Sequence, residues 1–234
     1  MTILHIETST KVCSAALTIG GVPIASLINR DEGNHARQLP LFVEQLLQQA
    51  RDRRLSVEAV ALSAGPGSYT GLRIGASTAK GLCYGLQVPL LPIPTTEVLC
   101  ASLAARCADR IPQEAWLCPM IDARRMEVYT ALYDQHLTVE EAIQAKVVEA
   151  DCWAEVLAQR PVVFMGDGAA KCKEVISSPN AIFVDDIVPE AQYMGVLAEQ
   201  LAADKARENV DIAYFDPLYV KDFVPAPSHV KGLV

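Results

Sequence analysis

Several of the patterns that assign a function by themselves are absent from this sequence. No apolar stretch approaches the roughly 18 uncharged residues that a membrane-spanning helix requires. The first residues lack the basic and apolar regions of a signal peptide, and we interpret them as the beginning of a strand. Neither G-x-S-x-G nor H-E-x-x-H occurs, so neither a serine hydrolase nor a zinc peptidase has a local motif. We therefore expect a cytoplasmic protein without membrane association.

Patterns for metal sites and disulfides are also missing. The seven cysteines are odd in number, and no pair has the C-x-x-C spacing, which argues against a zinc site or a disulfide framework. Because Cys13, Cys83, Cys100 and Cys118 lie in apolar segments, we expect reduced, buried thiols there. No two of the four histidines fall at i, i+4, so the sequence predicts no bound metal.

Positive charge is scarce. The chain has 20 Lys and Arg against 28 Asp and Glu, which gives a net charge of −8. A protein that holds nucleic-acid phosphates unaided normally has a basic face. The basic clusters here are small, namely Arg51 with Arg53 and Arg54, and the pair Arg124 and Arg125. Such clusters are usually solvated surface, so we expect any RNA role to depend on a more basic partner.

The elements that are present predict an α/β protein. Hydrophobic residues make up 51% of the chain, enough for a packed core. Alternation and buried runs predict strands at 2–7, 12–19, 22–27, 57–64, 117–122, 127–133 and 160–165. Apolar positions at helical spacing predict helices at 35–51, 69–86, 95–108 and 190–206. Gly20-Gly21 is typical of a hairpin turn.

The two halves of the chain repeat one pattern. An acid ends a strand in each half, Glu7 and Asp122, and a leucine follows ten residues later in both, Leu17 and Leu132. In each half a further strand then ends in glycines. Because these features keep the same order, we favour a duplicated domain over a coincidence between two hairpins.

The segment Gly65–Arg73 is the most distinctive. It is not a P-loop, because Leu72 stands where the lysine should follow the glycine, and its glycines do not fit G-x-G-x-x-G. A helix N-terminus after glycines can attract an anion. However, Gly71, Gly75 and Ala79 recur at i+4, which favours close packing of a neighbouring helix or sheet. The turn Thr8–Thr10 could likewise cradle a phosphate, but its spacing favours a simple polar turn.

Several blocks in order along the chain resemble the TsaB (YeaZ) family. They are ILHIETSTKVCSAAL, GPGSYTGLRIGASTAKGL, MIDARRMEVYTALYD, GDGA and DPLYVKDF. The resemblance covers nearly the whole chain, and the second block is very specific. It implies two actin-like (ribonuclease H-like) lobes, each a mixed sheet flanked by helices, with the second lobe reduced. We place the lobes at residues 1–103 and 104–234, with the final segment a candidate to return to the first lobe.

The resemblance also implies a function. It is that of a scaffold or activating subunit, which dimerises with the catalytic paralogue TsaD and acts with the ATPase TsaE. Together they transfer threonylcarbamoyl to the adenosine beside the anticodon of tRNAs that read ANN codons. The chain would then meet tRNA only within the complex and form a homodimer in isolation. The alternatives are an actin-fold ATP-dependent kinase and a metallopeptidase of the wider family.

This chain lacks the two histidines of the paralogue's metal-binding motif. The paralogue carries H-x-E-G-H after a strand, whereas this chain has Thr95 and Leu99 at the two histidine positions. The remaining Glu97 cannot replace two imidazole ligands. We therefore expect a catalytically degenerate subunit, with no catalytic residue and no metal of its own.

The resemblance also indicates candidate residues for nucleotide binding. In actin-fold ATPases, acids assist Mg²⁺ and glycines meet the adenosine. The residues of this chain in the corresponding order are Glu7, Thr8, Ser9, Thr10, Asp122, Gly166 and Gly168. We expect no cofactor on the chain alone and leave ATP or ADP with Mg²⁺ as candidates at the assembled complex.

The helices at 35–51 and 69–86 are the expected partner surface of the first lobe. By resemblance they pair with the two equivalent helices of the paralogue as a four-helix bundle. The residues assigned to this interface are His35, Leu39, Phe42, Val43, Leu46, Leu47, Gly71, Arg73, Ile74, Gly75, Thr78 and Ala79. The alternative is that both helices merely cover their own sheet, as one face of each must.

Overall fold

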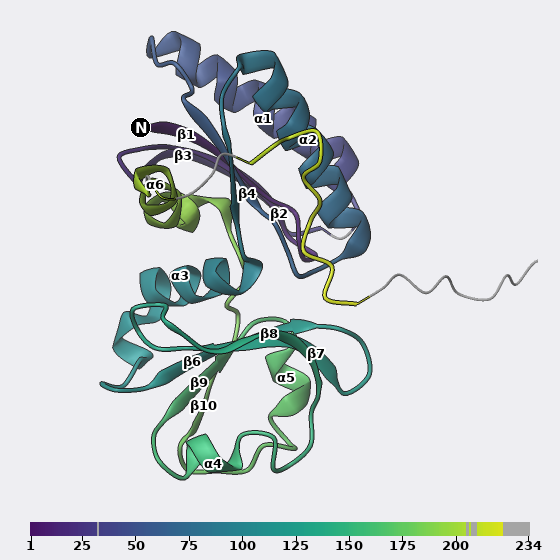
Figure 1. The fold of residues 1–234 in the computed structure, drawn as a ribbon, viewed down its shortest axis with the longest axis vertical. Coiled ribbons are helices and arrows are strands. Elements are labelled where there is room, and N and C mark those ends of the chain that lie inside the picture. The colour runs from purple at the N-terminus through teal and green to yellow at the C-terminus, as the bar shows by residue number, and fades with distance from the viewer. Residues whose placement is uncertain (32, 205, 207–209, 222–234) are drawn as a thin grey trace, which may run out of the picture.

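The computed structural model has two lobes, one above the other in Figure 1, and describes residues 1–31, 33–204, 206 and 210–221. Each lobe is built on one five-stranded sheet. The first sheet comprises β1 (Thr2–Glu7), β2 (Cys13–Ile19), β3 (Val22–Asn29), β4 (Ala59–Ser63) and β5 (Leu90–Ile93). The second comprises β6 (Trp116–Asp122), β7 (Glu127–Tyr133), β8 (Val139–Val147), β9 (Val162–Met165) and β10 (Ala181–Val184).

The two sheets have the same topology. Their orders are β3-β2-β1-β4-β5 and β8-β7-β6-β9-β10. In each, the first three strands form an antiparallel meander, and the last two add in parallel beside the first. This identity of order, direction and pairing confirms the α/β prediction and the duplicated architecture that the repeated pattern indicated.

The repeat is weaker at the level of single residues. Glu7 lies opposite Ser14 across the first hairpin, whereas Asp122 lies opposite Val128 across the second. The second hairpin is therefore one residue shorter. Because of this difference, the ten-residue spacing between acid and leucine does not mark equivalent rungs of the two ladders.

The helices cover the two sheets unequally. Helices α1 (His35–Asp52) and α2 (Tyr69–Leu86) lie side by side on the outer face of the first sheet, and α3 (Thr95–Cys107) lies between the lobes (Figure 1). The opposite face of the first sheet is covered by the 3-10 turn Ala191–Met194 and α6 (Gly195–Ala203). In the described part of the chain, the second lobe has only α4 (Ala154–Leu157) and α5 (Ala169–Cys172), with a further 3-10 turn at Ala108–Arg110. The second lobe is thus the reduced one, as predicted.

Two parts of the element prediction need correction. The helix expected at 190–206 is a 3-10 turn followed by the shorter α6. Gly195, at the junction, lies against the β2–β3 hairpin, where a Cβ atom would be 2.2 Å from the Gly21 carbonyl oxygen. The edge strands β5, β8 and β10 and the two four-residue helices were not predicted. β8 has no regular apolar alternation, and elements of four residues are too short to show a period.

The core connects the lobes through α3. Val98 packs with the first lobe's inner cluster, whereas Leu99 and Leu103 pack with the second lobe. Each of these three side chains is fully buried. Because one helix contributes to both cores, the two lobes share apolar contacts that a linker would not provide.

The chain returns to the first lobe after the second sheet. Met194 and Leu197 pack against the inner face of the first sheet, and Ile212 and Phe215 pack against the core beneath α2. In Figure 1 the yellow segment runs alongside α2. The 3-10 turn at 191–194, α6 and residues 212–215 thus lie against the first lobe, although the boundary at 103 and 104 groups them with the second lobe, whose final segment was the candidate to return.

Two simpler expectations can be compared with the structure. Cys13, Cys83, Cys100 and Cys118 are buried and free of disulfides, as predicted. Burial raises the pKa of the Cys13 thiol to about 12. Among the described residues, no helix is both long and apolar enough to cross a membrane.

Candidate functional site: the cleft between the lobes

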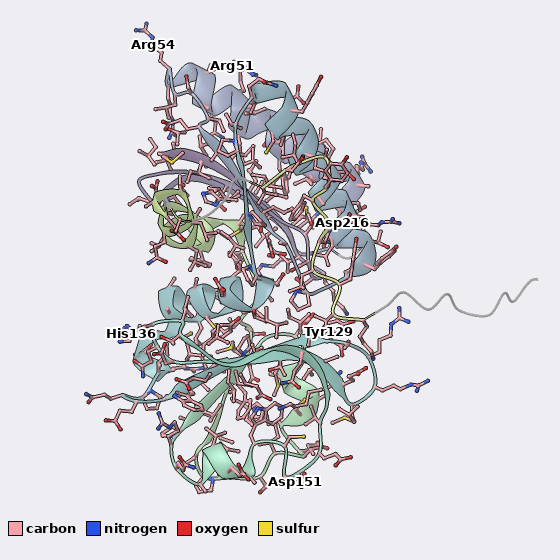
Figure 2. All side chains as sticks on the ribbon, viewed as in Figure 1. Arg51, Arg54, Tyr129, His136, Asp151 and Asp216 are labelled. Carbon is pink, nitrogen blue, oxygen red and sulfur yellow. The ribbon has the colours of Figure 1, made fainter. Side chains whose placement is uncertain are left out.

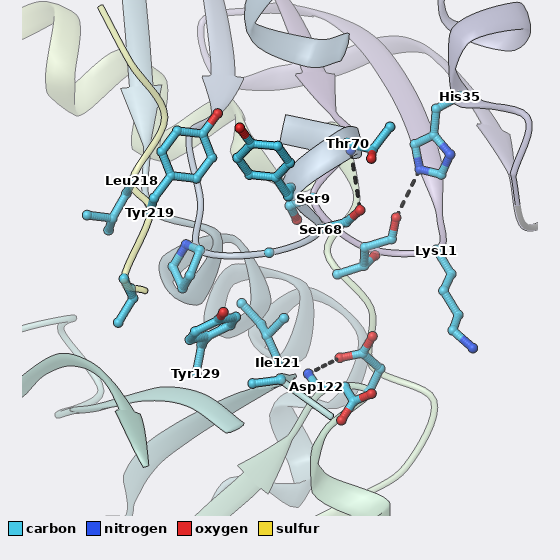
Figure 3. A pocket seen from close by; sticks show the side chains of 18 of the residues that line it. Ser9, Lys11, His35, Ser68, Thr70, Ile121, Asp122, Tyr129, Leu218 and Tyr219 are labelled. Atoms are coloured by element: carbon cyan, nitrogen blue, oxygen red, sulfur yellow. Dashed lines mark hydrogen bonds between the residues drawn. The ribbon is translucent and has the colours of Figure 1, made fainter. Parts of the chain in front are cut away.

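A cleft of about 910 Å³ separates the lobes on one side of the molecule. The first lobe contributes the β1–β2 turn (residues 9–11), the start of α1 and the start of α2. The second lobe contributes the end of β6 with the turn after it, Tyr129 and Asp167. Residues 218–221 also line the cleft (Figure 3). Parts far apart in sequence therefore meet at one concave site, the usual position for a ligand or partner.

The β1–β2 turn packs against the start of α2, and this contact explains the glycine-rich segment. A Cβ atom on Gly71 would lie 2.0 Å from the carbonyl oxygen of Thr8, and one on Gly67 would lie 2.3 Å from that of Ser9. A Cβ atom on Gly75 would lie 2.3 Å from the Thr8 hydroxyl. The glycines thus permit close approach, as expected, but the neighbour is the chain's own turn.

Glu7 is buried behind this turn and does not line the cleft. Its Oε1 accepts hydrogen bonds from the Ser9 N–H at 2.5 Å and the Ser9 hydroxyl at 2.6 Å. Burial raises the pKa of the Glu7 carboxyl. The Thr8 hydroxyl, also fully buried, donates to the carbonyl oxygen of Gly71 at 2.8 Å. Both side chains therefore hold the first lobe together and face no ligand in this arrangement.

Asp122 has different surroundings at the end of β6. It is exposed, and its carboxylate accepts a hydrogen bond from the Lys171 ammonium and one from the Arg124 N–H at 3.2 Å. The Asp122 N–H donates to Asp167 Oδ1 at 2.9 Å (Figure 3). Burial, reinforced by the nearby Asp122 charge, raises the pKa of Asp167. The second lobe thus presents charged groups where the first has buried ones.

Gly166 and Gly168 pack against β6. Gly166 has a φ of 108°, and a Cβ atom there would lie 2.2 Å from the Met120 carbonyl oxygen. A Cβ atom on Gly168 would lie 2.9 Å from Val128 and 3.0 Å from the Ile121 carbonyl carbon. The absence of side chains at these two positions is therefore explained by packing.

The predicted nucleotide residues divide into two groups. Ser9, Thr10 and Asp122 line the cleft, whereas Glu7, Thr8 and the two glycines do not. The Mg²⁺–ATP site that the resemblance implied would use both acids, but Glu7 is buried and Asp122 is paired with Lys171. The residues present do not fit that group in this conformation.

Residues that the sequence reasoning assigned no role also line the cleft. Tyr69 and Tyr219 lie with their ring centroids 5.2 Å apart. The Leu218 N–H donates to the Ala64 carbonyl oxygen at 2.7 Å, and Lys221 reaches the second lobe, 2.5 Å from Glu127 Oε2. The block DPLYVKDF was the available signal, but nothing in it showed that this segment crosses the cleft.

The positions that correspond to the paralogue's histidines lie on α3. The Thr95 hydroxyl is hydrogen-bonded to that of Ser63 at 2.8 Å, and Thr96 is bonded to the Tyr133 hydroxyl at 2.7 Å. Leu99 is fully buried in an apolar cluster. Among the described residues, no group of three His, Cys, Asp or Glu side chains is arranged as metal ligands.

The predicted partner residues require correction, because many of them lie inside the first lobe. Arg73 is exposed, and Phe42, Leu47, Ile74 and Thr78 are partly exposed. The buried ones are His35, Leu39, Val43, Leu46, Gly71, Gly75 and Ala79. These form the inward faces of α1 and α2, apart from His35, whose Nε2 bonds to the Thr10 carbonyl oxygen at 2.9 Å. A stripe of apolar and small residues does not reveal from sequence whether its own sheet or a partner covers it.

Comparison with known proteins identifies the family. The chain is 30% identical to the tRNA threonylcarbamoyladenosine biosynthesis protein TsaB of Bacillus subtilis, over 94% of each chain. The chain belongs to the TsaB family. Its structure also matches YeaZ from Pseudomonas aeruginosa, with 26% identity, a TM-score of 0.76 and coverage of 93% of this chain and 99% of that one. The predicted family and its two-lobed α/β fold are thereby confirmed.

The TsaB family is related to a catalytic one. The family model described as "TsaD: tRNA N6-adenosine threonylcarbamoyltransferase" matches residues 29–224. A tRNA N6-adenosine threonylcarbamoyltransferase of Aromatoleum aromaticum is 45% identical over 74 residues, which is 32% of this chain and 20% of that protein. The likeness to that one transferase is thus local, whereas the TsaD family model and the likeness to TsaB both extend over most of the chain.

Proposed function

We propose that this chain serves tRNA threonylcarbamoyladenosine biosynthesis as a non-catalytic subunit that pairs with a TsaD-like paralogue. The observation that carries the proposal is the similarity to TsaB over 94% of both chains. The match to the TsaD family model supports the pairing, because subunits that share a fold can associate through equivalent faces. The ATPase TsaE as a further partner, and a homodimer without partners, remain part of this proposal.

The lack of catalysis by the chain alone is argued from α3. Thr95 and Leu99 stand at the two histidine positions of the paralogue's motif. Leu99 has no donor atom, and the Thr95 hydroxyl is already bonded to Ser63. Catalysis would therefore reside in the paralogue. ATP or ADP with Mg²⁺ at the assembled complex stays a prediction.

The exposed side of α1 and α2 is the proposed partner face. Large apolar side chains reach solvent there, including Leu41, which is 46% exposed, and Tyr84, which is 74% exposed. Ile74 and Thr78 lie on α2 and are half-buried. Exposed apolar groups on two adjacent long helices are typical of a protein interface.

Reconstitution tests the function. The purified chain, the TsaD-like paralogue and TsaE from the same organism are incubated with threonylcarbamoyl adenylate, ATP and an unmodified tRNA. We expect modified adenosine only when this chain and the paralogue are both present. Equal turnover without this chain, or turnover by this chain alone, would refute the proposed role.

A substitution on the partner face tests the pairing. Thr78→Arg places a charge on the exposed side of α2, and we expect at least a tenfold loss of association with the paralogue. Val196→Arg is the matched control, because Val196 is 61% exposed on α6, which covers the opposite face of the sheet. Val43 and Gly75 are unsuitable for this test, since both are buried in the lobe's own core. Equal association of both variants would place the interface elsewhere.

A further inference from the structure

The turn between β6 and β7 holds two consecutive arginines in a left-handed backbone conformation. Arg124 has a φ of 69° and Arg125 a φ of 49°. Glycine, and after it asparagine, adopts the left-handed conformation most readily, because a Cβ atom makes it unfavourable for other residues. The turn is held by the Glu127 N–H, which donates to the Arg124 carbonyl oxygen at 3.1 Å. The protein therefore keeps arginine where a smaller residue would be more stable.

The same two side chains are unpaired cations. Arg124 and Arg125 are exposed, and within the described part of the chain neither guanidinium has an ion-pair or hydrogen-bond partner. The neighbouring lysines do have ion-pair partners, since Lys171 pairs with Asp122 and Lys221 pairs with Glu127. The turn thus concentrates uncompensated positive charge on a chain whose net charge is −8.

The location of the turn links it to the site. Arg124 lines the cleft between the lobes, as does Lys11 from the first lobe. The other arginine cluster lies at the far end of the first lobe, where Figure 2 labels Arg51 and Arg54. There Arg51 is hydrogen-bonded to Gln48 at 2.8 Å, so that cluster is partly committed to its own helix. Of the two described arginine clusters, only the one at the β6–β7 turn combines unpaired guanidinium groups with a position at the cleft.

We infer that the β6–β7 turn contacts the phosphodiester backbone of the tRNA when this subunit is in its complex. This inference rests on the proposed function. Residues that keep an unfavourable backbone conformation are concentrated at functional sites. Arginine is the side chain best suited to bind phosphate. The exposed arginines do not converge with other donors into an enclosed cage, which a free phosphate ion would need. Since the rest of the chain is acidic, the contact orients the RNA and adds little affinity without the partner.

The test replaces the turn by the sequence that the backbone prefers. Arg124→Asn with Arg125→Gly is assembled with the TsaD-like paralogue, and the binding of an unmodified tRNA transcript is followed by fluorescence anisotropy at several salt concentrations. We expect about tenfold weaker binding at physiological salt. The slope of log K against log salt should fall by about 1.4 to 1.8, because two phosphate contacts are lost. The melting temperature of the isolated variant should rise, because the turn is relieved.

A matched control removes the same charge elsewhere. Arg54, just after α1, also has a positive φ, of 58°. The double variant Arg51→Ala with Arg54→Gly therefore removes two cations and relieves one left-handed residue. It should also raise the melting temperature, but leave tRNA affinity and salt slope unchanged.

The outcomes separate the possibilities. Unchanged tRNA affinity in an assembled complex of the turn variant would overturn the inference, as would an equal loss in the control. Loss of assembly with the paralogue would also overturn it, because the turn would then contact protein. The wild-type proteins are tested before any variant. If they neither assemble nor modify tRNA, the proposed function itself fails.

Discussion

The two lobes share one strand order but differ in what covers their sheets. The first sheet carries two helices of 18 residues on its outer face, whereas the second carries two of four residues. The turns after the first strands differ as well. The first lobe buries Glu7 and Thr8 beneath α2, and the second exposes Asp122 and the arginines that follow it.

This contrast shows how duplicated folds divide their roles. Because Gly71 and Gly75 let α2 approach the β1–β2 turn, the polar groups of that turn are used inside the lobe. The second lobe's outer helices are too short to cover its turn, so charged groups remain available there. Under the two proposals above, the protein partner contacts the helices of the first lobe, and the RNA contacts the turn of the second.

The largest effect should come from breaking the close packing of the first lobe. Gly71→Ala would place a methyl group 2.0 Å from the Thr8 carbonyl oxygen, which is backbone and cannot move aside freely. We expect a loss of about 3 kcal/mol or more in the free energy of unfolding. Urea titration followed by circular dichroism measures it. A loss below about 1 kcal/mol would show that the turn and α2 are not tightly packed.

Acid should weaken the first lobe through His5. This side chain is fully buried on β1, and burial lowers its pKa to about 3. The unfolded chain has the ordinary pKa of about 6.5, so it binds more protons than the folded chain between those values. Stability should therefore fall as the pH drops below about 6.5, by up to about 1.4 kcal/mol per pH unit.

Urea unfolding at several pH values measures this slope. His5→Gln should reduce the slope, whereas His136→Gln should leave it unchanged, because His136 is exposed. Both tryptophans, Trp116 and Trp153, belong to the second lobe. Their fluorescence can therefore be compared with hydrogen exchange in β1 to show which lobe loosens first. A slope that is the same in the wild type and in His5→Gln would disprove the assignment.

A smaller effect of opposite sign should come from the exposed face of α2. Nothing lies within 4 Å of a Cβ atom built on Gly81. Gly81→Ala should raise the free energy of unfolding by about 0.8 kcal/mol, because alanine has the higher helix propensity. Compared with Gly71→Ala, this variant shows whether an added methyl group has opposite effects on the buried and the exposed face of α2. Destabilisation would mean that this face is already covered in the isolated protein, for example by a second copy.

The smallest effect should come from the ion pair between the lobes. Lys221 and Glu127 are partly exposed, so solvent screens their attraction. Lys221→Met should change the free energy of unfolding by less than about 0.5 kcal/mol. Thermal melts at low and high salt measure the change. A loss above about 1 kcal/mol would show that this segment, and not α3 alone, holds the lobes together.

Much of the fold was available from the sequence. The helix from Tyr69 to Leu86 was predicted at its observed bounds, and α1 differs by one residue, because long amphipathic helices carry several turns of periodic signal. The duplicated architecture followed from the repeated order of strand, acid, turn and strand. Buried thiols followed from the apolar segments that contain them. The edge strand β8 was missed, since its alternation is interrupted by polar residues.

The candidate site was less predictable, because its groups meet only in the folded chain. The Thr8 hydroxyl and the Gly71 carbonyl are 63 residues apart in sequence, and their contact decides that the glycine-rich segment serves packing. Glu7 and Asp122 are both acids at the ends of strands, yet one is buried and the other exposed. Local sequence sets the period and polarity of each element and so determines helices, strands and family blocks. Burial depends on which distant surface covers each side chain, and that is decided only when the elements pack.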